Sequence, residues 1–180
     1  MNPASQAIAQ RPRDAEFHSV FIVRTDLAVE QLSDLVGLRF TFGSESSTSG
    51  HLMPRFFLQN LGINPDSEFR GNPGYSGSHD KTWQLVEAGA FDAGALSEAV
   101  WENAVAAGKI DISKVRALYR TPSYFDYNWS IAGDIDATYG EGTQSAVTTA
   151  LLRLSLDLGA NEAELLNFFQ TDRFIKTKNT

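Results

Sequence analysis

Residues 43–57 read GSESSTSGHLMPRFF and separate two patterns of apolar residues. Before them, residues 38–42 (LRFTF) alternate between apolar and polar side chains, which is typical of a strand. After Gly50, apolar residues recur at helical spacing as far as Leu61, and Gly62 follows at a helix C-cap position. The stretch therefore predicts a strand, then a hydroxyl-rich turn, then a helix over about residues 49–61.

This turn has the composition of an anion-binding loop. The first N–H groups of a helix have no intrahelical acceptor and carry a partial positive charge. Ser47, Thr48 and Ser49 add hydroxyl donors, and Gly50 lets a ligand approach the backbone. We predict an oxyanion cradle here. The alternative is that the serines only cap the helix.

A second turn, at residues 76–80 (SGSHD), repeats this pattern before a helical stretch that stops at Gly89. Open α/β sheets bind ligands beyond the carboxyl ends of their parallel strands, so the two turns can converge on one ligand. His79 could then donate a hydrogen bond to an oxyanion, or add charge if protonated. The alternative is a histidine that caps the helix or lies on the surface.

The remaining patterns complete an α/β chain. Apolar runs predict strands at residues 20–23, 91–96, 115–119 and 129–132, with a helix over 98–107. Strands that alternate with helices imply a mostly parallel sheet flanked by helices. Residues 1–16 are polar and predict a weakly ordered or exposed helical lead-in. Two further helices follow after residue 140, and Asn161 is expected to cap the second.

Composition excludes several classes of protein. The 180 residues, 42% of them hydrophobic, can bury a core, yet no apolar run approaches the roughly 20 residues of a membrane span. The net charge of −7 argues against non-specific binding of nucleic acid. With no cysteine, no metal-ligand spacing among the three histidines and no nucleotide motif, we expect neither metal nor cofactor. Residues 1–13 contain no apolar signal-peptide core.

Catalysis has weak support in the sequence. Ser47, His79 and Asp80 are the residue types of a hydrolase triad, but an adjacent His and Asp cannot easily orient each other. No G-x-S-x-G elbow occurs. An enzyme that uses Ser47 or His79 is therefore the alternative to a binding protein, and a domain that contacts a permease or sensor without binding a ligand is a third hypothesis.

Four segments resemble the PhnD-type substrate-binding proteins, which serve ATP-driven uptake of phosphonate, phosphite and related oxyanions. They are SSTSGHLMP (residues 46–54), YSGSHD (75–80), DAGAL (92–96) and TPSYFDY (121–127), in matching order and spacing. The ending QTDRFI (170–175) resembles the branch associated with selenate or phosphonate binding. The resemblance runs from about residue 5 to the C-terminus.

This resemblance implies a type II periplasmic binding protein fold, with two lobes that close on the ligand like a hinge. It implies a periplasmic, non-catalytic receptor for phosphonate, phosphite, phosphate or selenate, with an ABC permease as partner. The family's anion-binding positions fall on Ser47, Thr48, Ser49 and His79. The same two turns add Gly50 and Ser78 as ligand-binding candidates, and Asp126 lies near a carboxylate position of the family.

Relatives that bind an aminoalkyl phosphonate place a second carboxylate against the ammonium group, at the position that Ala99 occupies here. The resemblance therefore favours a small oxyanion without an amine.

The resemblance also divides the chain. Residues 1–30 would be a lead-in and crossover strand, 31–121 lobe two, and 122–180 the return crossover with the C-terminal helices of lobe one. The secretion signal and the first half of lobe one would be missing. We therefore expect exposed apolar faces on the C-terminal helices, and reduced stability or association with itself or with a partner.

Overall fold

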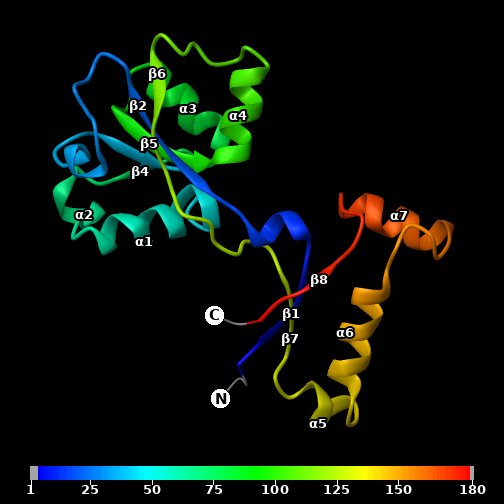
Figure 1. Ribbon diagram of the computed structural model, residues 1–180. Coiled ribbons are helices and arrows are strands. Elements are labelled where there is room, and N and C mark those ends of the chain that lie inside the picture. Colours follow the sequence, from blue (N-terminus) through cyan, green and yellow to red (C-terminus); the bar gives the residue numbers. More distant parts are fainter. Residues whose placement is uncertain (1–3, 179–180) are drawn as a thin grey trace. The chain divides into compact units, whose positions relative to one another are not determined.

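The computed structural model describes residues 4–178, and the chain forms two units (Figure 1). The larger unit is continuous in sequence, from His18 to Ser123. The smaller unit combines residues before and after it, 4–17 and 124–178. The larger unit begins at His18 rather than at residue 31, because the strand that follows His18 lies inside its sheet.

The larger unit is built on a five-stranded sheet in the order β4-β3-β5-β2-β6. Its strands are β2 (Ser19–Arg24), β3 (Phe40–Phe42), β4 (Gly74–Tyr75), β5 (Ala93–Ser97) and β6 (Val115–Arg120). β3 pairs in parallel with β4 and β5, whereas β2 is antiparallel to both β5 and β6. Four strands therefore share one direction, as a mostly parallel sheet requires, and β2 is a reversed strand that alternation alone did not predict.

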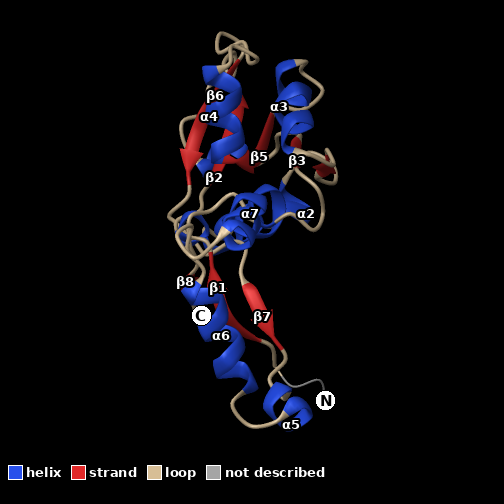
Figure 2. Ribbon diagram, turned by 90° about the vertical axis from the view of Figure 1, so that its right-hand side faces the viewer, coloured by secondary structure: helices blue, strands red, loops and turns tan. Residues whose placement is uncertain are grey.

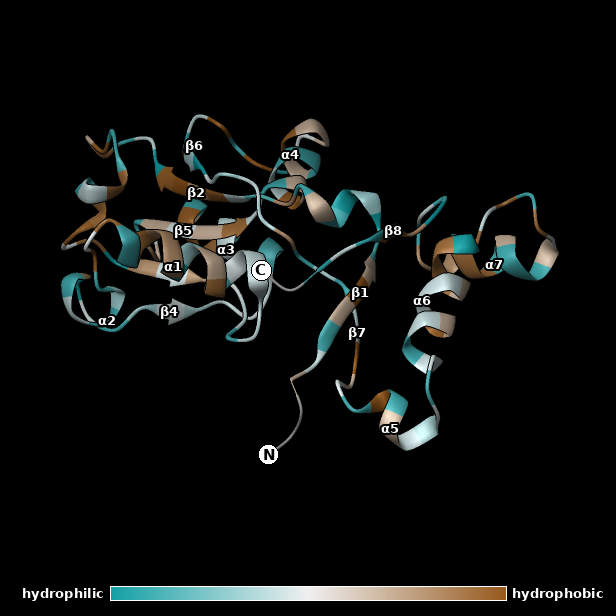
Figure 3. Cartoon of the chain, turned by 60° about the horizontal axis from the view of Figure 1, so that its bottom comes forward, coloured by the Kyte–Doolittle hydropathy of each residue, from teal (hydrophilic) through white to brown (hydrophobic). Residues whose placement is uncertain are grey.

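Both faces of this sheet are covered. The helical elements are η2 (Leu32–Leu35), η3 (Thr48–Leu52, a π-helical turn), α1 (Met53–Asn60), α2 (Pro65–Glu68), α3 (His79–Glu87) and α4 (Glu98–Ala106). Alternate residues of β2 explain the two layers, because Phe21 packs in the same core as Leu58 of α1, whereas Ile22 packs with Val86 of α3. Figure 3 shows the apolar colour of β2 and β5 at the centre of this unit.

The smaller unit holds an antiparallel sheet in the order β7-β1-β8. Its elements are β1 (Gln6–Gln10), η1 (Pro12–Ala15), β7 (Trp129–Ile131), α5 (Ile135–Tyr139), α6 (Thr143–Arg153), α7 (Ala160–Phe168) and β8 (Ile175–Lys176), shown by type in Figure 2. The expectation of a weakly ordered or helical lead-in is wrong, since β1 is the central strand and Ala9 is fully buried with Leu166 and Phe174.

Two smaller findings concern the C-terminal helices. The N-cap of α7 is Gly159, without a side-chain cap, so the expectation that Asn161 caps this helix is wrong. Large apolar side chains are exposed on these helices, and Phe168 is 79% accessible. The described part of the chain contains no helix that is long and apolar enough to cross a membrane.

Candidate functional site

The first hydroxyl-rich turn connects β3 to η3 at the carboxyl end of the strand. Ser47 is the N-cap, and its Oγ accepts a hydrogen bond from the Gly50 amide at 2.9 Å. The Ser47 carbonyl accepts from both His51 and Leu52, and the Gly43 amide donates back to the Gly50 carbonyl at 2.8 Å. These bonds fold the turn tightly over the start of the helix, with Gly50 at its centre.

Within the described part of the chain, the amides and hydroxyls of Thr48 and Ser49 have no hydrogen-bond acceptor. Helix N-terminal N–H groups carry the positive end of the helix dipole. Ser49 is buried and is held from behind, because the Ser19 hydroxyl at the start of β2 donates to its carbonyl at 2.8 Å. The turn thus presents neutral donors from which an oxyanion could accept hydrogen bonds.

The second turn follows β4 and is attached to the first. The amides of Ser76 and Gly77 donate to the carbonyls of Phe42 and Gly43 at 3.0 and 3.2 Å. Ser78 is the N-cap of α3, and its Oγ accepts from the Lys81 amide at 3.2 Å. Both turns therefore lie at the carboxyl edge of the parallel strands, where open α/β folds bind ligands.

His79 and Gly50 bring the two turns into contact. A Cβ atom placed on Gly50 would lie 3.1 Å from Cε1 of His79, 3.0 Å from Oγ of Ser47 and 3.2 Å from Cα of Gly43. A side chain at this position would therefore crowd both turns, whose atoms would have to give by a few tenths of an ångström, and glycine permits the close approach.

The tautomer of His79 follows from its partner. The backbone N–H of Ser97, at the end of β5, donates to Nδ1 of His79 at 3.2 Å. Burial lowers the pKa of His79, and the neighbouring Asp80 carboxylate only partly opposes this. The ring is therefore neutral at neutral pH, with its proton on Nε2, and acts as one more donor.

His79 has no carboxylate that would orient it as a general base in the described residues. The Asp80 carboxylate instead accepts from the indole N–H of Trp83 at 3.3 Å. Because Nδ1 already accepts the Ser97 amide, a base–orienter pair of the triad type does not form.

The remaining sequence candidates serve as caps or belong to the smaller unit. The Oγ atoms of Ser47 and Ser78 already accept hydrogen bonds as helix caps. Asp126 is buried in the smaller unit, where its amide donates to the Asp14 carbonyl at 2.9 Å. Glu98, next to Ala99, forms an ion pair with Arg120, so its carboxylate is already neutralised.

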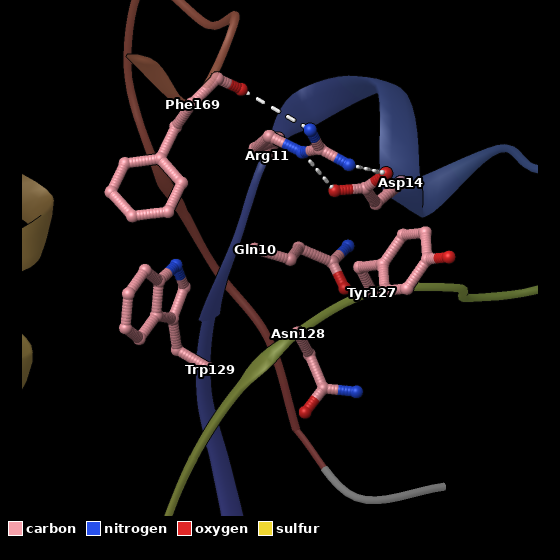
Figure 4. Close-up of a pocket in the computed structure, with 7 residues that line it drawn as sticks. All are labelled: Gln10, Arg11, Asp14, Tyr127, Asn128, Trp129 and Phe169. Carbon is pink, nitrogen blue, oxygen red and sulfur yellow. Dashed lines mark hydrogen bonds and ion pairs between the residues drawn. The ribbon is translucent and has the colours of Figure 1, made fainter. Parts of the chain in front are cut away.

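The smaller unit has a hollow of its own, of about 430 Å³ (Figure 4). The side chains that line it are Gln10, Arg11, Asp14, Tyr127, Asn128, Trp129 and Phe169. Arg11 is fixed there by Asp14 and by the Phe169 carbonyl, at 2.8 and 3.1 Å. Gln10 is 2% exposed, and its Oε1 has no hydrogen-bond partner among the described residues.

Sequence reasoning missed two residues that shape the two hydroxyl-rich turns. The Ser97 amide fixes the His79 ring. The only signal for Ser97 in the sequence was its position between the end of the apolar run 91–96 and the start of the next helix. His51 contacts the first turn through its Nδ1, which lies 2.6 Å from the Glu45 carbonyl. The sequence analysis considered His51 only as one of three histidines without metal-ligand spacing.

Comparison with known proteins identifies the family to which this chain is similar. Residues 2–180 match the family described as ABC transporter, phosphonate, periplasmic substrate-binding protein. A relative in Prochlorococcus marinus (strain MIT 9301), the probable ABC transporter phosphite binding protein PhnD1, is 42% identical over 184 residues. That alignment covers 98% of this chain and 61% of the relative, so the chain spans about three fifths of the relative's length.

Solved structures agree. PhnD1 from Prochlorococcus marinus in complex with methylphosphonate superposes with a TM-score of 0.73 at 40% identity, covering 99% of this chain and 67% of that one. XAC2383 from Xanthomonas citri bound to ATP also gives 0.73, at 26% identity, with 94% and 64% covered. A phosphonate-transporter binding protein from Pseudomonas aeruginosa (PA3383), at 15% identity, shares the fold with a TM-score of 0.65, with 97% and 58% covered. The chain belongs to the periplasmic substrate-binding proteins of phosphonate ABC transporters.

Proposed function

We propose that this chain binds a small tetrahedral oxyanion, of the phosphonate or phosphite class, as the receptor of an ABC importer. The observation that carries the proposal is the contact between the two turns. Gly50 lies against His79, so the free donors of Thr48 and Ser49 and the Nε2–H of His79 belong to one edge of one sheet. A tetrahedral anion offers acceptors to several such donors at once.

The donors are neutral, which matches reversible binding better than turnover. An anion held by backbone dipoles and hydroxyls requires no counter-charge to be buried with it. The absence of a base–orienter pair at His79 within the described residues argues against hydrolysis, and the names of the relatives describe binding proteins.

A ligand without an amine fits these residues better than an aminophosphonate. The position beside Glu98 carries Ala99, and the Glu98 carboxylate is paired with Arg120. Asp126 is the remaining carboxylate candidate, and we propose it as a ligand-binding residue on the resemblance of its segment alone. By family membership, we also propose that the protein works in the periplasm with an ABC permease.

Isothermal titration calorimetry of the whole chain tests the proposal. We expect saturable binding of methylphosphonate or phosphite, weaker binding of aminoethylphosphonate, and no release of product. Phosphate, sulfate and selenate belong in the same series, because the preferred anion defines the substrate. No heat with any of these anions, from a sample whose circular dichroism shows it to be folded, would refute the proposal. Turnover of a phosphate ester that His79→Ala abolishes would favour the enzyme.

A further inference from the structure

His51 uses both nitrogens of its ring, although it lies outside the donor set. Nε of Arg55 donates to Nε2 of His51 at 2.9 Å, and a guanidinium can only donate. Nε2 is therefore unprotonated, and the ring proton lies on Nδ1, which donates to the Glu45 carbonyl at 2.6 Å. This pair of bonds requires the neutral imidazole in one tautomer.

The surroundings hold the ring in this position. His51 is 9% exposed and packs between Phe42 of β3 and Tyr75 of β4, with ring centroids 4.8 and 4.9 Å away. The Tyr75 hydroxyl lies 3.3 Å from Nε2. Arg55 is the charged group that faces the ring, and Asp66 of α2 fixes the guanidinium through two bonds of 2.8 and 3.0 Å.

His51 is joined to the anion-binding turn at two points. It follows Gly50 directly, and its Nδ1–H holds the carbonyl of Glu45, which lies inside the turn two residues before Ser47. Ser47 in turn supplies the cap and the carbonyl around which η3 begins. The orientation of the Thr48 and Ser49 donors therefore depends on a turn that the His51 ring fastens.

We propose that His51 is a positioning residue of the oxyanion site and that it fastens the first turn through both of its ring nitrogens. This inference rests on the proposed function and assigns to it a residue that need not touch the ligand. Loss of the Nδ1–H would release the Glu45 carbonyl, so the turn would lose a bond that fixes it and anion affinity would fall.

Two substitutions separate the two bonds of the ring. In His51→Asn, the amide N–H reaches the place of Nδ1 and can still donate to Glu45, but the shorter side chain offers no acceptor at the place of Nε2. In His51→Gln, the amide can still accept from Arg55 but lies too far along the side chain to hold Glu45. At pH 7.5 we expect His51→Asn to bind methylphosphonate within about 3-fold of the wild type, and His51→Gln about 10-fold more weakly.

Rescue by the conservative variant distinguishes positioning from mere support of the fold. Each variant keeps one of the two ring bonds, so urea unfolding should show similar losses of stability for both, whereas only His51→Gln should lose affinity. Equal losses of affinity in both variants would overturn the inference.

A measurement without ligand keeps the two proposals apart. In ¹H–¹⁵N spectra of the whole chain we expect the His51 ring to carry its proton on Nδ1, and His51→Gln to shift the amide resonances of residues 47–50 more than His51→Asn does. If no anion binds, the proposed function fails, yet these shifts still test His51. Equal shifts in both variants, or none in either, would contradict its positioning role.

Discussion

Replacing Gly50 by alanine tests the contact on which the site depends. The added methyl group would lie 3.0–3.2 Å from atoms of Ser47, His79 and Gly43, where ordinary contacts begin at about 3.4 Å. One of these atoms is backbone, one is the oxygen that caps η3, and one belongs to the His79 ring. All three neighbours would have to move by a few tenths of an ångström. Overpacking of this kind costs about 1–3 kcal/mol.

The same movement should weaken anion binding, because it separates the two turns that supply the donors. Loss or misalignment of one hydrogen bond to a charged ligand corresponds to about 1.5–3 kcal/mol, so we expect affinity for methylphosphonate to fall by about 10-fold or more. Calorimetry measures the affinity, and urea unfolding measures the free energy of unfolding on the same protein.

Gly71→Ala is the matched control for this experiment. Gly71 has a φ of +79° and nothing within 4 Å of an added Cβ, so alanine there suffers backbone strain without a collision. Its free energy of unfolding should fall by about 1 kcal/mol, with anion affinity unchanged. If Gly50→Ala binds as tightly as the wild type, the two turns do not form one site. If Gly71→Ala weakens binding equally, the effect reports stability rather than the contact.

Three further predictions follow from single contacts. His79→Asn keeps an oxygen that can accept a hydrogen bond from the Ser97 amide but removes the Nε2–H donor, whereas His79→Gln can keep a donor at that place. Calorimetry should therefore show weaker anion binding for His79→Asn than for His79→Gln. The reverse order would contradict the assigned tautomer of His79. Thr48→Val should cost about 1–3 kcal/mol of binding free energy, whereas Thr138→Val on exposed helix α5 should cost none. The Arg39 guanidinium holds the pKa of Asp92 below its usual value. The pair therefore stabilises the fold fully above the ordinary carboxyl pKa, and this stabilisation is lost as the pH falls through the lowered pKa of Asp92. Asp92→Asn should reduce the urea midpoint at pH 7 and make it decline less steeply in acid.

Much of the larger unit could be predicted from the sequence because its elements have strong local patterns. The apolar run 20–23 lies in β2, and the residues with helical spacing that follow His79 and Glu98 form α3 and α4. Trp83 of α3 and Trp101 of α4 are buried as core residues. The two turns were found because glycine and hydroxyl residues stood between a strand pattern and a helix pattern.

The failures concern long-range pairing, which local patterns do not record. β1 contains only the short apolar run 7–9 between two glutamines and was predicted to be weakly ordered or helical, yet it pairs with β7 and β8 from the far end of the chain. The reversed direction of β2 has the same cause, because strand direction depends on which neighbours the strand meets and not on its own composition.

The structure divides the hydroxyl residues of the two turns into caps and donors, and this division bears on how the site works. Ser47 and Ser78 hold the ends of η3 and α3, whereas Thr48 and Ser49 keep their donors available. A sequence pattern cannot separate these roles, because a cap and a ligand donor are the same chemical group at neighbouring positions. The caps set the direction of the helix N–H groups, so Ser47→Ala should weaken binding by misplacing the donors of Thr48, even though its own oxygen already accepts the Gly50 amide. Affinity in such a site depends on alignment rather than on net charge. A chain with a net charge of −7 can therefore still hold an anion, provided that neutral groups are fixed in place before the ligand arrives.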